Sequence, residues 1–315
     1  MNKNTITLIE ASNGHFYKIE GDEFMEPLEL PSSTTILTAF PNPGLDMWFK
    51  NTSAEEIKRK QDEGMIQGTK VHKIIELRIM GKTVLGKGLS NDNISSLGLS
   101  EPGLIRYLKE PLTKREEEAQ EGIENFWDEL KPKTIASEIM VYNPLWTDIK
   151  TGKLISKARY ENLSAEKKVD YVCQGFAGTL DWIGYLWDKK TKKYDLWIVD
   201  WKISKALSAS YDLQLCSYWK AFETTYGKNY PNLRIGILQL GKNKCKYSFK
   251  EIKNKRGDSS KDKNHAKKLA WEMFLHTKAL HDYLHPNNKP RVEVRREQFD
   301  ALNSYKKKGK SIKIN

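Results

Sequence analysis

Two charged side chains that could do chemistry lie within residues 195–204 (DLWIVDWKIS), a stretch that otherwise has the bulky composition of a buried strand. Asp200 and Lys202 flank Trp201, so in an extended strand both charges project from one face and the tryptophan from the other. Charges are rarely placed in a buried strand without a partner or a function. A carboxylate next to a lysine is suited to holding a cation and contacting an anion.

A second acid, Asp181, lies in the preceding apolar run, residues 178–183 (GTLDWI). Polar residues 188–193 (DKKTKK) separate the two runs and predict a hairpin turn, so we expect the two strands to pair antiparallel. One register of this pairing places Asp181 beside Asp200. Two neighbouring carboxylates repel each other unless a cation lies between them, and all-oxygen ligation favours Mg²⁺ or Mn²⁺.

Residues 53–80 have the pattern of a helix, and within it Gly68, His72 and Glu76 are four apart and share one face. We expect Gly68 to let this face approach the sheet closely. His72 could then reach the metal, with Glu76 supporting it. A histidine taken alone is more often structural, but the acids and the lysine on the strands favour a metal ligand here.

The elements that must position these residues can be predicted from hydrophobic periodicity and turn signals. A short strand pair is expected within residues 1–30, followed by a helical segment that residues 41–44 (PNPG) end. Residues 82–117 have no clear pattern. Further helices are expected at 115–129, 208–226 and 262–284, and strands at 134–142, 169–186, 194–203, 233–240 and 244–252. The order helix, three strands, helix, strand predicts an α/β fold with a mixed sheet flanked by helices.

The composition is that of a globular protein: of 315 residues, 38% are hydrophobic and 30% are charged. No apolar run approaches the roughly 20 residues that cross a membrane, and the first residues do not resemble a signal peptide, so we expect a cytoplasmic protein. Three widely spaced cysteines exclude a four-cysteine zinc or iron–sulfur site within this chain.

The net charge of +12 is concentrated near the C-terminus. Residues 242–268 carry eleven Lys and Arg against three acids, and residues 291–315 carry eight against three. This distribution favours a polyanionic partner such as nucleic acid, whose binding would be sensitive to salt. A lysine-rich solvated surface without a partner is an equally good explanation of the charge alone.

The combined motifs resemble those of the PD-(D/E)XK nuclease superfamily, and within it the RecB-type and phage exonucleases and the mitochondrial genome maintenance exonuclease. The resemblance spans residues 31–226. The matching strings are Pro31-Ser32-Ser33-Thr34-Thr35-Ile36-Leu37, Gly68-x-x-x-His72-x-x-x-Glu76, Gly178-Thr179-Leu180-Asp181, Asp200-Trp201-Lys202 and Gln214-x-x-x-Tyr218.

This resemblance implies a fold and an activity. The fold is a restriction-endonuclease-like αβββαβ core at residues 53–252, with an N-terminal extension at 1–52 and a C-terminal helix and basic tail at 253–315, all in one domain overall. The activity is Mg²⁺-dependent hydrolysis of DNA phosphodiester bonds, with Mn²⁺ expected to substitute. Some members carry a four-cysteine cluster, but this chain should be a member without an iron–sulfur cluster.

The resemblance also implies roles for individual residues. Asp181 and Asp200 would hold the metal, with His72 and the backbone carbonyl of Trp201 as further ligands and Glu76 behind them. Lys202 would orient or help to deprotonate the attacking water and stabilise the phosphate. Gln214 and Tyr218 would either position the substrate or pack the helix against the sheet. Glu138 would either contact the metal or substrate or face solvent. Trp48 is a candidate for stacking on an unpaired base, with no functional role as the alternative.

We therefore expect a DNA exonuclease of recombination, repair or phage replication, in the host cytoplasm if phage-encoded. A structure-specific endonuclease on the same core is one alternative, and a nucleic-acid-binding protein with a vestigial site is another. A decayed site should have lost at least one motif residue, which argues against the last. We expect DNA as the partner and no association with a membrane. Whether the protein forms a homo-oligomer or works with an ATPase or recombination partner stays open.

Overall fold

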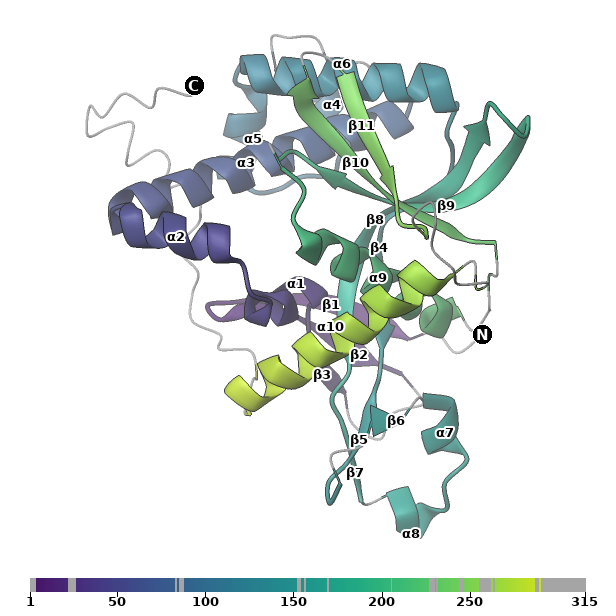
Figure 1. Ribbon diagram of the computed structural model, residues 1–315. Helices are drawn as coiled ribbons and strands as arrows, with labels where there is room; N and C mark the ends of the chain where they lie inside the picture. The colour runs from purple at the N-terminus through teal and green to yellow at the C-terminus, as the bar shows by residue number, and fades with distance from the viewer. Residues whose placement is uncertain are drawn as a thin grey trace.

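A five-stranded mixed sheet lies at the centre of the computed structural model, with helices on both of its faces (Figure 1). The structure describes residues 4–21, 27–82, 84, 88–151, 154–155, 157–168, 170–204, 206–226, 230, 232–243, 246–254, 262, 264–286 and 289. The strands run in the order β11-β10-β9-β8-β4, with bounds β4 Lys133–Asn143, β8 Phe176–Asp188, β9 Lys193–Lys202, β10 Arg234–Asn243 and β11 Lys246–Glu251. Only β9 and β10 pair in parallel; the other neighbours are antiparallel.

The two faces of the sheet are covered by different helices. On one face pack α3 (Ala54–Ile79), α5 (Pro102–Lys109) and α6 (Lys114–Leu130), which bury Trp182, Val199 and Trp201 of the sheet. On the other face pack α9 (Ala209–Tyr226) and α10 (His265–Leu284), over Ile198 and Ile237. The alternation of side chains along β9 therefore divides its apolar residues between two cores.

The hairpin of β8 and β9 forms as predicted, with Asp188 paired to Lys193 at its turn. The ladder between these strands runs as far as Trp182 and Val199, whereas β8 continues back to Phe176 and β9 continues to Lys202. The two strands thus part at one end of the sheet. Asp181 and Asp200 are the next residues in register after the last pair, so both acids lie at this fork.

The N-terminal residues form a separate antiparallel sheet, β1-β2-β3, with bounds β1 Thr5–Ala11, β2 Gly14–Glu20 and β3 Leu28–Pro31. It leads into α1 (Ser33–Ile36) and the 3₁₀ turn η1 (Leu37–Ala39). Ser32 caps α1 and forms a parallel bridge to Ala177 of β8, and Ser217 Oγ of α9 donates a hydrogen bond to Ser33 Oγ at 2.9 Å. These contacts fix the segment 32–39 between β8 and α9.

Several elements differ from the sequence-based prediction. Helix α2 (Pro43–Asn51) was not predicted, because Pro and Gly at 41–44 were interpreted only as a helix end. In the structure Pro43 occupies the first turn, where a missing N–H is harmless, and the Asn42 side chain caps the helix. The unpatterned region contains α5 and the short α4 (Asn91–Ser96), while the basic tail 291–315 lies outside the described residues.

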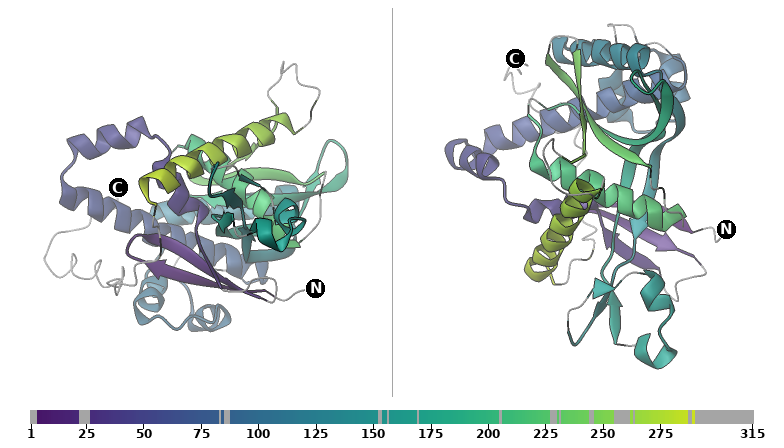
Figure 2. Two further views of the ribbon diagram at one scale, coloured as in Figure 1. Left: turned by 90° about the horizontal axis from the view of Figure 1, so that it is seen from below. Right: turned by 45° about the vertical axis from the view of Figure 1, so that its right-hand side comes forward.

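The predicted strand 169–186 is divided into β7 (Tyr171–Cys173) and β8. Between them the backbone passes close to β4's end, since a Cβ on Gly175 would lie 2.3 Å from the Asn143 carbonyl oxygen. β7 joins a small sheet with β5 (Trp146–Asp148) and β6 (Leu154–Ile155), which projects from the body with α7 (Lys157–Glu161) and α8 (Ala165–Lys168) (Figures 1 and 2).

The long helix predicted at 53–80 is present as α3, capped by Ser53, whose hydroxyl accepts a hydrogen bond from the Glu56 N–H. Glu56 itself pairs with Arg59, so the reciprocal half of a capping box is replaced by this ion pair. Gly81 follows the helix with φ +73°, as expected for a C-terminal cap. In the part of the chain that the structure describes, no helix has the length and apolar character needed to span a membrane.

Candidate metal centre

Three carboxylates lie in a row across neighbouring strands of the central sheet. The pairs Ser137–Trp182 and Ile139–Leu180 place Glu138 of β4 opposite Asp181 of β8. Asp200 of β9 follows on the other side of Asp181 at the fork. The register that the sequence left open is therefore the one that brings Asp181 alongside Asp200.

His72 of α3 joins this row from the helical layer. One potential ligand atom from each of His72, Glu138 and Asp181 lies within 4.8 Å of the others, a spacing that could hold a metal ion. His72 Nδ1 is 3.7 Å from Glu138 Oε1. An imidazole with two carboxylates is a donor set that suits Mn²⁺ and other divalent ions, and carboxylate oxygens suit Mg²⁺.

Asp200 lies outside this group of three but is itself in need of a cation. Its side chain is only 1% exposed, and Lys202 Nζ lies 2.8 Å from its Oδ2. Oδ2 is held by this ion pair, whereas Oδ1 has no hydrogen-bond partner among the residues that the structure describes. A buried carboxylate with one oxygen left without a partner fits a site for a divalent cation beside Asp181.

Trp201 connects the acids through its backbone. Its N–H donates a hydrogen bond to Asp181 Oδ2 at 2.7 Å, so a side chain takes the place of the ladder partner that β8 no longer supplies. The N–H and C=O of one strand residue face the same neighbouring strand, and the Trp201 carbonyl consequently faces Asp181 as well. The Trp201 ring packs in the core against Phe126, Trp127 and Trp182.

Burial and crowding of like charges set the protonation of the site. Burial, and then the neighbouring Asp200, raise the pKa of Asp181 to about 7, against the opposing effects of His72 and Lys202. Burial alone would lower the pKa of His72 and of Lys202, but the nearby carboxylates outweigh it and raise both. The carboxylates thus favour the cationic forms of both bases, as expected where negative charge is in excess.

Gln214 and Tyr218 reach the same region from α9. Gln214 Nε2 donates a hydrogen bond to the Tyr218 hydroxyl at 2.8 Å, and both side chains are buried. The Tyr218 ring lies directly over Gly178, where an added Cβ would be 2.4 Å from its Cε1 atom. Burial, and then Asp200, raise the pKa of Tyr218, which remains a neutral hydroxyl near these acids.

The structure places three other sequence candidates differently. Glu76 lies one turn beyond His72 and pairs with Lys73 at 2.6 Å, outside the group of potential ligands. The expectation for Gly68 is wrong, because a Cβ there would meet nothing within 4 Å and the glycine faces open space. Trp48 lies on α2 beside Phe49, with ring centroids 5.3 Å apart.

Sequence reasoning left Glu138 undecided, and the structure places it against His72 and Asp181. Its backbone has φ +53°, a left-handed conformation that is unusual for a glutamate within a strand. Tyr211 was not among the predicted site residues, yet its ring lies 5.0 Å from Lys202 Nζ. Its place three residues before Gln214 was the available signal in the sequence.

Four acidic or imidazole side chains lie at the end of the sheet where β8 and β9 part: the group His72, Glu138 and Asp181, and next to it Asp200, which is ion-paired to Lys202. Such a site can hold a divalent cation and contact the anionic group of a substrate. No model of a known protein family matches the sequence, and a search of curated proteins gave no match.

Proposed function

We propose that the protein is a metal-dependent deoxyribonuclease that hydrolyses phosphodiester bonds, acting as an exonuclease in recombination, repair or phage replication. The observation that carries this proposal is the row Glu138–Asp181–Asp200, with Lys202 held 2.8 Å from Asp200 and His72 beside the other two acids. A site of this kind combines cation ligands with a fixed positive charge, which is what phosphodiester hydrolysis requires.

The ligands of the metal would be His72, Glu138, Asp181 and Asp200, together with the Trp201 carbonyl. When bound, a divalent ion supplies an activated water and neutralises charge that develops on the phosphate. The protein's own contribution is to hold these ligands rigidly. Asp181 is oriented by the Trp201 N–H, and each of the two strands that carry the aspartates is anchored in the cores on both faces of the sheet.

Lys202 has the geometry of an electrostatic group. Its raised pKa keeps the ammonium charged, so it can hydrogen-bond to a phosphate oxygen or orient a water rather than accept a proton. The ion pair with Asp200 and the Tyr211 ring fix its position before substrate arrives. Loss of one preorganised group of this type costs about 3–4 kcal/mol of barrier.

The order of elements supports the proposed restriction-endonuclease-like core. Helix α3, strands β4, β8 and β9, helix α9 and strand β10 follow one another along the chain as helix, three strands, helix, strand, apart from the inserted elements. The site residues come from the first helix, the three strands and the second helix of this series. The excess of Lys and Arg in residues 242–268 and 291–315 supports DNA as the substrate.

Purified protein should be incubated with end-labelled linear DNA and with circular DNA, each single- and double-stranded, in Mg²⁺ or in EDTA. The proposal predicts progressive loss of nucleotides from the ends of linear DNA in Mg²⁺ and no reaction in EDTA. Nicking of circles would instead support an endonuclease. Binding of DNA without cleavage in Mg²⁺ or Mn²⁺ would overturn the proposal of an enzyme.

A further inference from the structure

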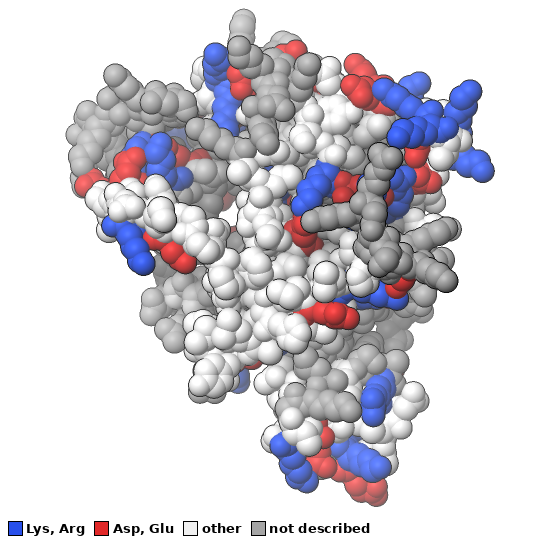
Figure 3. Space-filling model, viewed as in Figure 1, with Lys and Arg blue, Asp and Glu red and all other residues white. Residues whose placement is uncertain are grey.

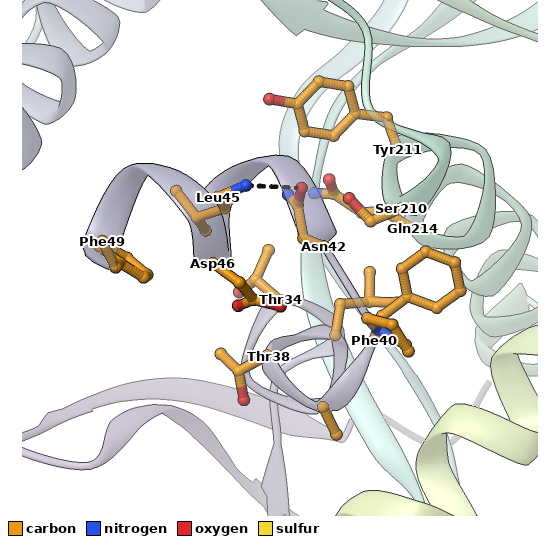
Figure 4. Close-up of a pocket in the computed structure, with 13 residues that line it drawn as sticks. Thr34, Thr38, Phe40, Asn42, Leu45, Asp46, Phe49, Ser210, Tyr211 and Gln214 are labelled. Atoms are coloured by element: carbon orange, nitrogen blue, oxygen red, sulfur yellow. Dashed lines mark hydrogen bonds between the residues drawn. The ribbon is translucent and has the colours of Figure 1, made fainter. Parts of the chain in front are cut away.

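A pocket of about 460 Å³ opens between the segment 34–49 and the start of α9. Figure 4 shows Phe40 and Phe49 at its two ends in that view, with Asn42 and Gln214 reaching toward the space between them. Its volume lies in the range of cavities that bind small organic groups, about 300–1,000 Å³. Neither the metal ligands nor Lys202 line it.

The lining of the pocket has the chemistry of a site for a planar, uncharged group. Two phenylalanine rings provide apolar faces, while amides and hydroxyls provide hydrogen-bonding groups. Among the described residues that line it there is no Lys or Arg, and the one charged residue is Asp46. Figure 3 shows that the surface around α1 and the start of α2 is largely uncharged. A phosphate would be repelled here, whereas the amino groups of a base could donate to Asp46.

Both amides in the wall are held in place by hydrogen bonds of their own. Asn42 Oδ1 accepts from the Leu45 N–H at 3.2 Å, and Gln214 Nε2 donates to the Tyr218 hydroxyl at 2.8 Å. Their orientations are therefore set before a ligand binds, which reduces the entropic cost of binding.

The pocket adjoins the metal centre through two residues that belong to both. Tyr211 lines the pocket, and its ring lies 5.0 Å from Lys202 Nζ. Gln214 lines the pocket and is bonded to Tyr218, whose ring packs against Gly178 of the strand that carries Asp181. A group bound in the pocket is thus separated from Lys202 by a single side chain.

We propose that this pocket binds one unpaired nucleobase of the DNA strand whose phosphate lies at Asp200 and Lys202, an inference that rests on the proposed function. Stacking of the base on Phe49 or Phe40 draws its nucleotide out of a stacked strand and aligns the adjacent phosphate with the metal centre. The protein accordingly acts on single-stranded ends or on ends that it unpairs.

The test is a binding measurement with short single-stranded oligonucleotides in EDTA, in which one abasic residue is moved position by position from the end. We expect an abasic residue at one position to weaken binding about tenfold, as loss of one stacked base does. Phe49→Ala should weaken binding of the intact strand by a similar factor but change binding of that abasic strand less than twofold. Leu45→Trp, which fills the pocket, should behave like Phe49→Ala.

Met47→Ala is the matched control, since Met47 is 66% exposed on the same helix and does not line the pocket. It should bind every strand as the wild type does. Equal effects of abasic residues at all positions, additive effects of Phe49→Ala and the abasic residue, or no binding of single strands would overturn the proposal. A position-specific effect shared with Phe49→Ala, in a protein that cleaves no DNA in Mg²⁺ or Mn²⁺, would uphold the base pocket and overturn the nuclease.

Discussion

Asp181 on β8 accepts a hydrogen bond of 2.7 Å from the backbone N–H of Trp201 on β9, at the point where the ladder between the two strands has ended. The Asp181 side chain thus accepts the hydrogen bond that a backbone carbonyl of β8 would accept if the ladder continued. It is thereby held between Glu138 on one side and Asp200 on the other. The hydrogen bond from the Trp201 N–H orients the Asp181 carboxylate and also holds it in a buried position, where ionisation is unfavourable.

Asp181→Asn should stabilise the metal-free protein at alkaline pH. The pKa of Asp181 is raised to about 7 by burial and by Asp200, from an ordinary value of 3.8. Between these pH values the folded state holds a proton that the unfolded state releases, so the free energy of unfolding falls as pH rises through this window. The amide cannot ionise and its oxygen can still accept from the Trp201 N–H. Urea unfolding in EDTA should show a gain on the order of 2 kcal/mol at pH 8 and a smaller one at pH 5.

Asp195→Asn provides the contrast, because this acid lies on the neighbouring strand β9 and pairs with Arg234 at 2.6 Å. Its replacement should leave the free energy of unfolding at pH 8 unchanged or lower it. A gain for Asp181→Asn that is equal at both pH values would contradict the account of its buried charge.

Glu138 should tolerate glycine better than alanine. Its φ of +53° lowers the free energy of unfolding by about 1–2 kcal/mol for a residue with a Cβ, whereas glycine adopts this conformation without strain. Glu138→Gly and Glu138→Ala both remove the carboxylate, so both should bind Mn²⁺ more weakly than the wild type in titration calorimetry. Chemical unfolding should nevertheless find the glycine variant more stable than the alanine variant by about 1 kcal/mol.

Ser137, the preceding residue, is not among the residues with positive φ and serves as the control. There the order should reverse, with Ser137→Ala more stable than Ser137→Gly. If Glu138→Ala were also more stable than Glu138→Gly, the backbone at Glu138 would not be strained.

Two glycines should respond in opposite ways to alanine. At Gly178 a Cβ would lie 2.4 Å from Tyr218 Cε1, so the ring must move, at a cost of about 1–3 kcal/mol, and nuclease activity should fall with it. At Gly68 the Cβ would meet open space within α3, so alanine should stabilise the helix by up to about 1 kcal/mol. Thermal unfolding of both variants checks this, and a Gly178→Ala protein as stable as the wild type would show that Tyr218 does not pack there.

The parts of the fold that follow local rules could be predicted from the sequence. The hairpin of β8 and β9 was indicated by its apolar runs and polar turn, and the helix expected at 53–80 is present as α3, Ala54–Ile79. Only the register was open, because alternation fixes which face a side chain takes but not which residue it meets.

Features that depend on tertiary contacts could not be predicted. Glu138 was ambiguous because an acid in a strand can face solvent or a site, and only the pairing with β8 decides this. Glu76 shares a helix face with His72, yet the nearby Lys73 draws it into an ion pair. Gly68 was expected to mark a close approach, but the open space beside it depends on how α3 lies over the sheet.

We propose that Asp200 and Lys202 catalyse metal-dependent cleavage of DNA, and single-turnover cleavage of end-labelled linear DNA measures their contribution to this step. The comparison is between wild type, Asp200→Ala, Lys202→Ala and the control Asp195→Asn, in Mg²⁺ and in EDTA, with DNA binding measured on the same samples. We predict cleavage in Mg²⁺ by the wild type and the control, a loss of at least about 100-fold in each of the other two variants, and largely retained binding. Cleavage by either variant at close to the wild-type rate would contradict the assignment of this site.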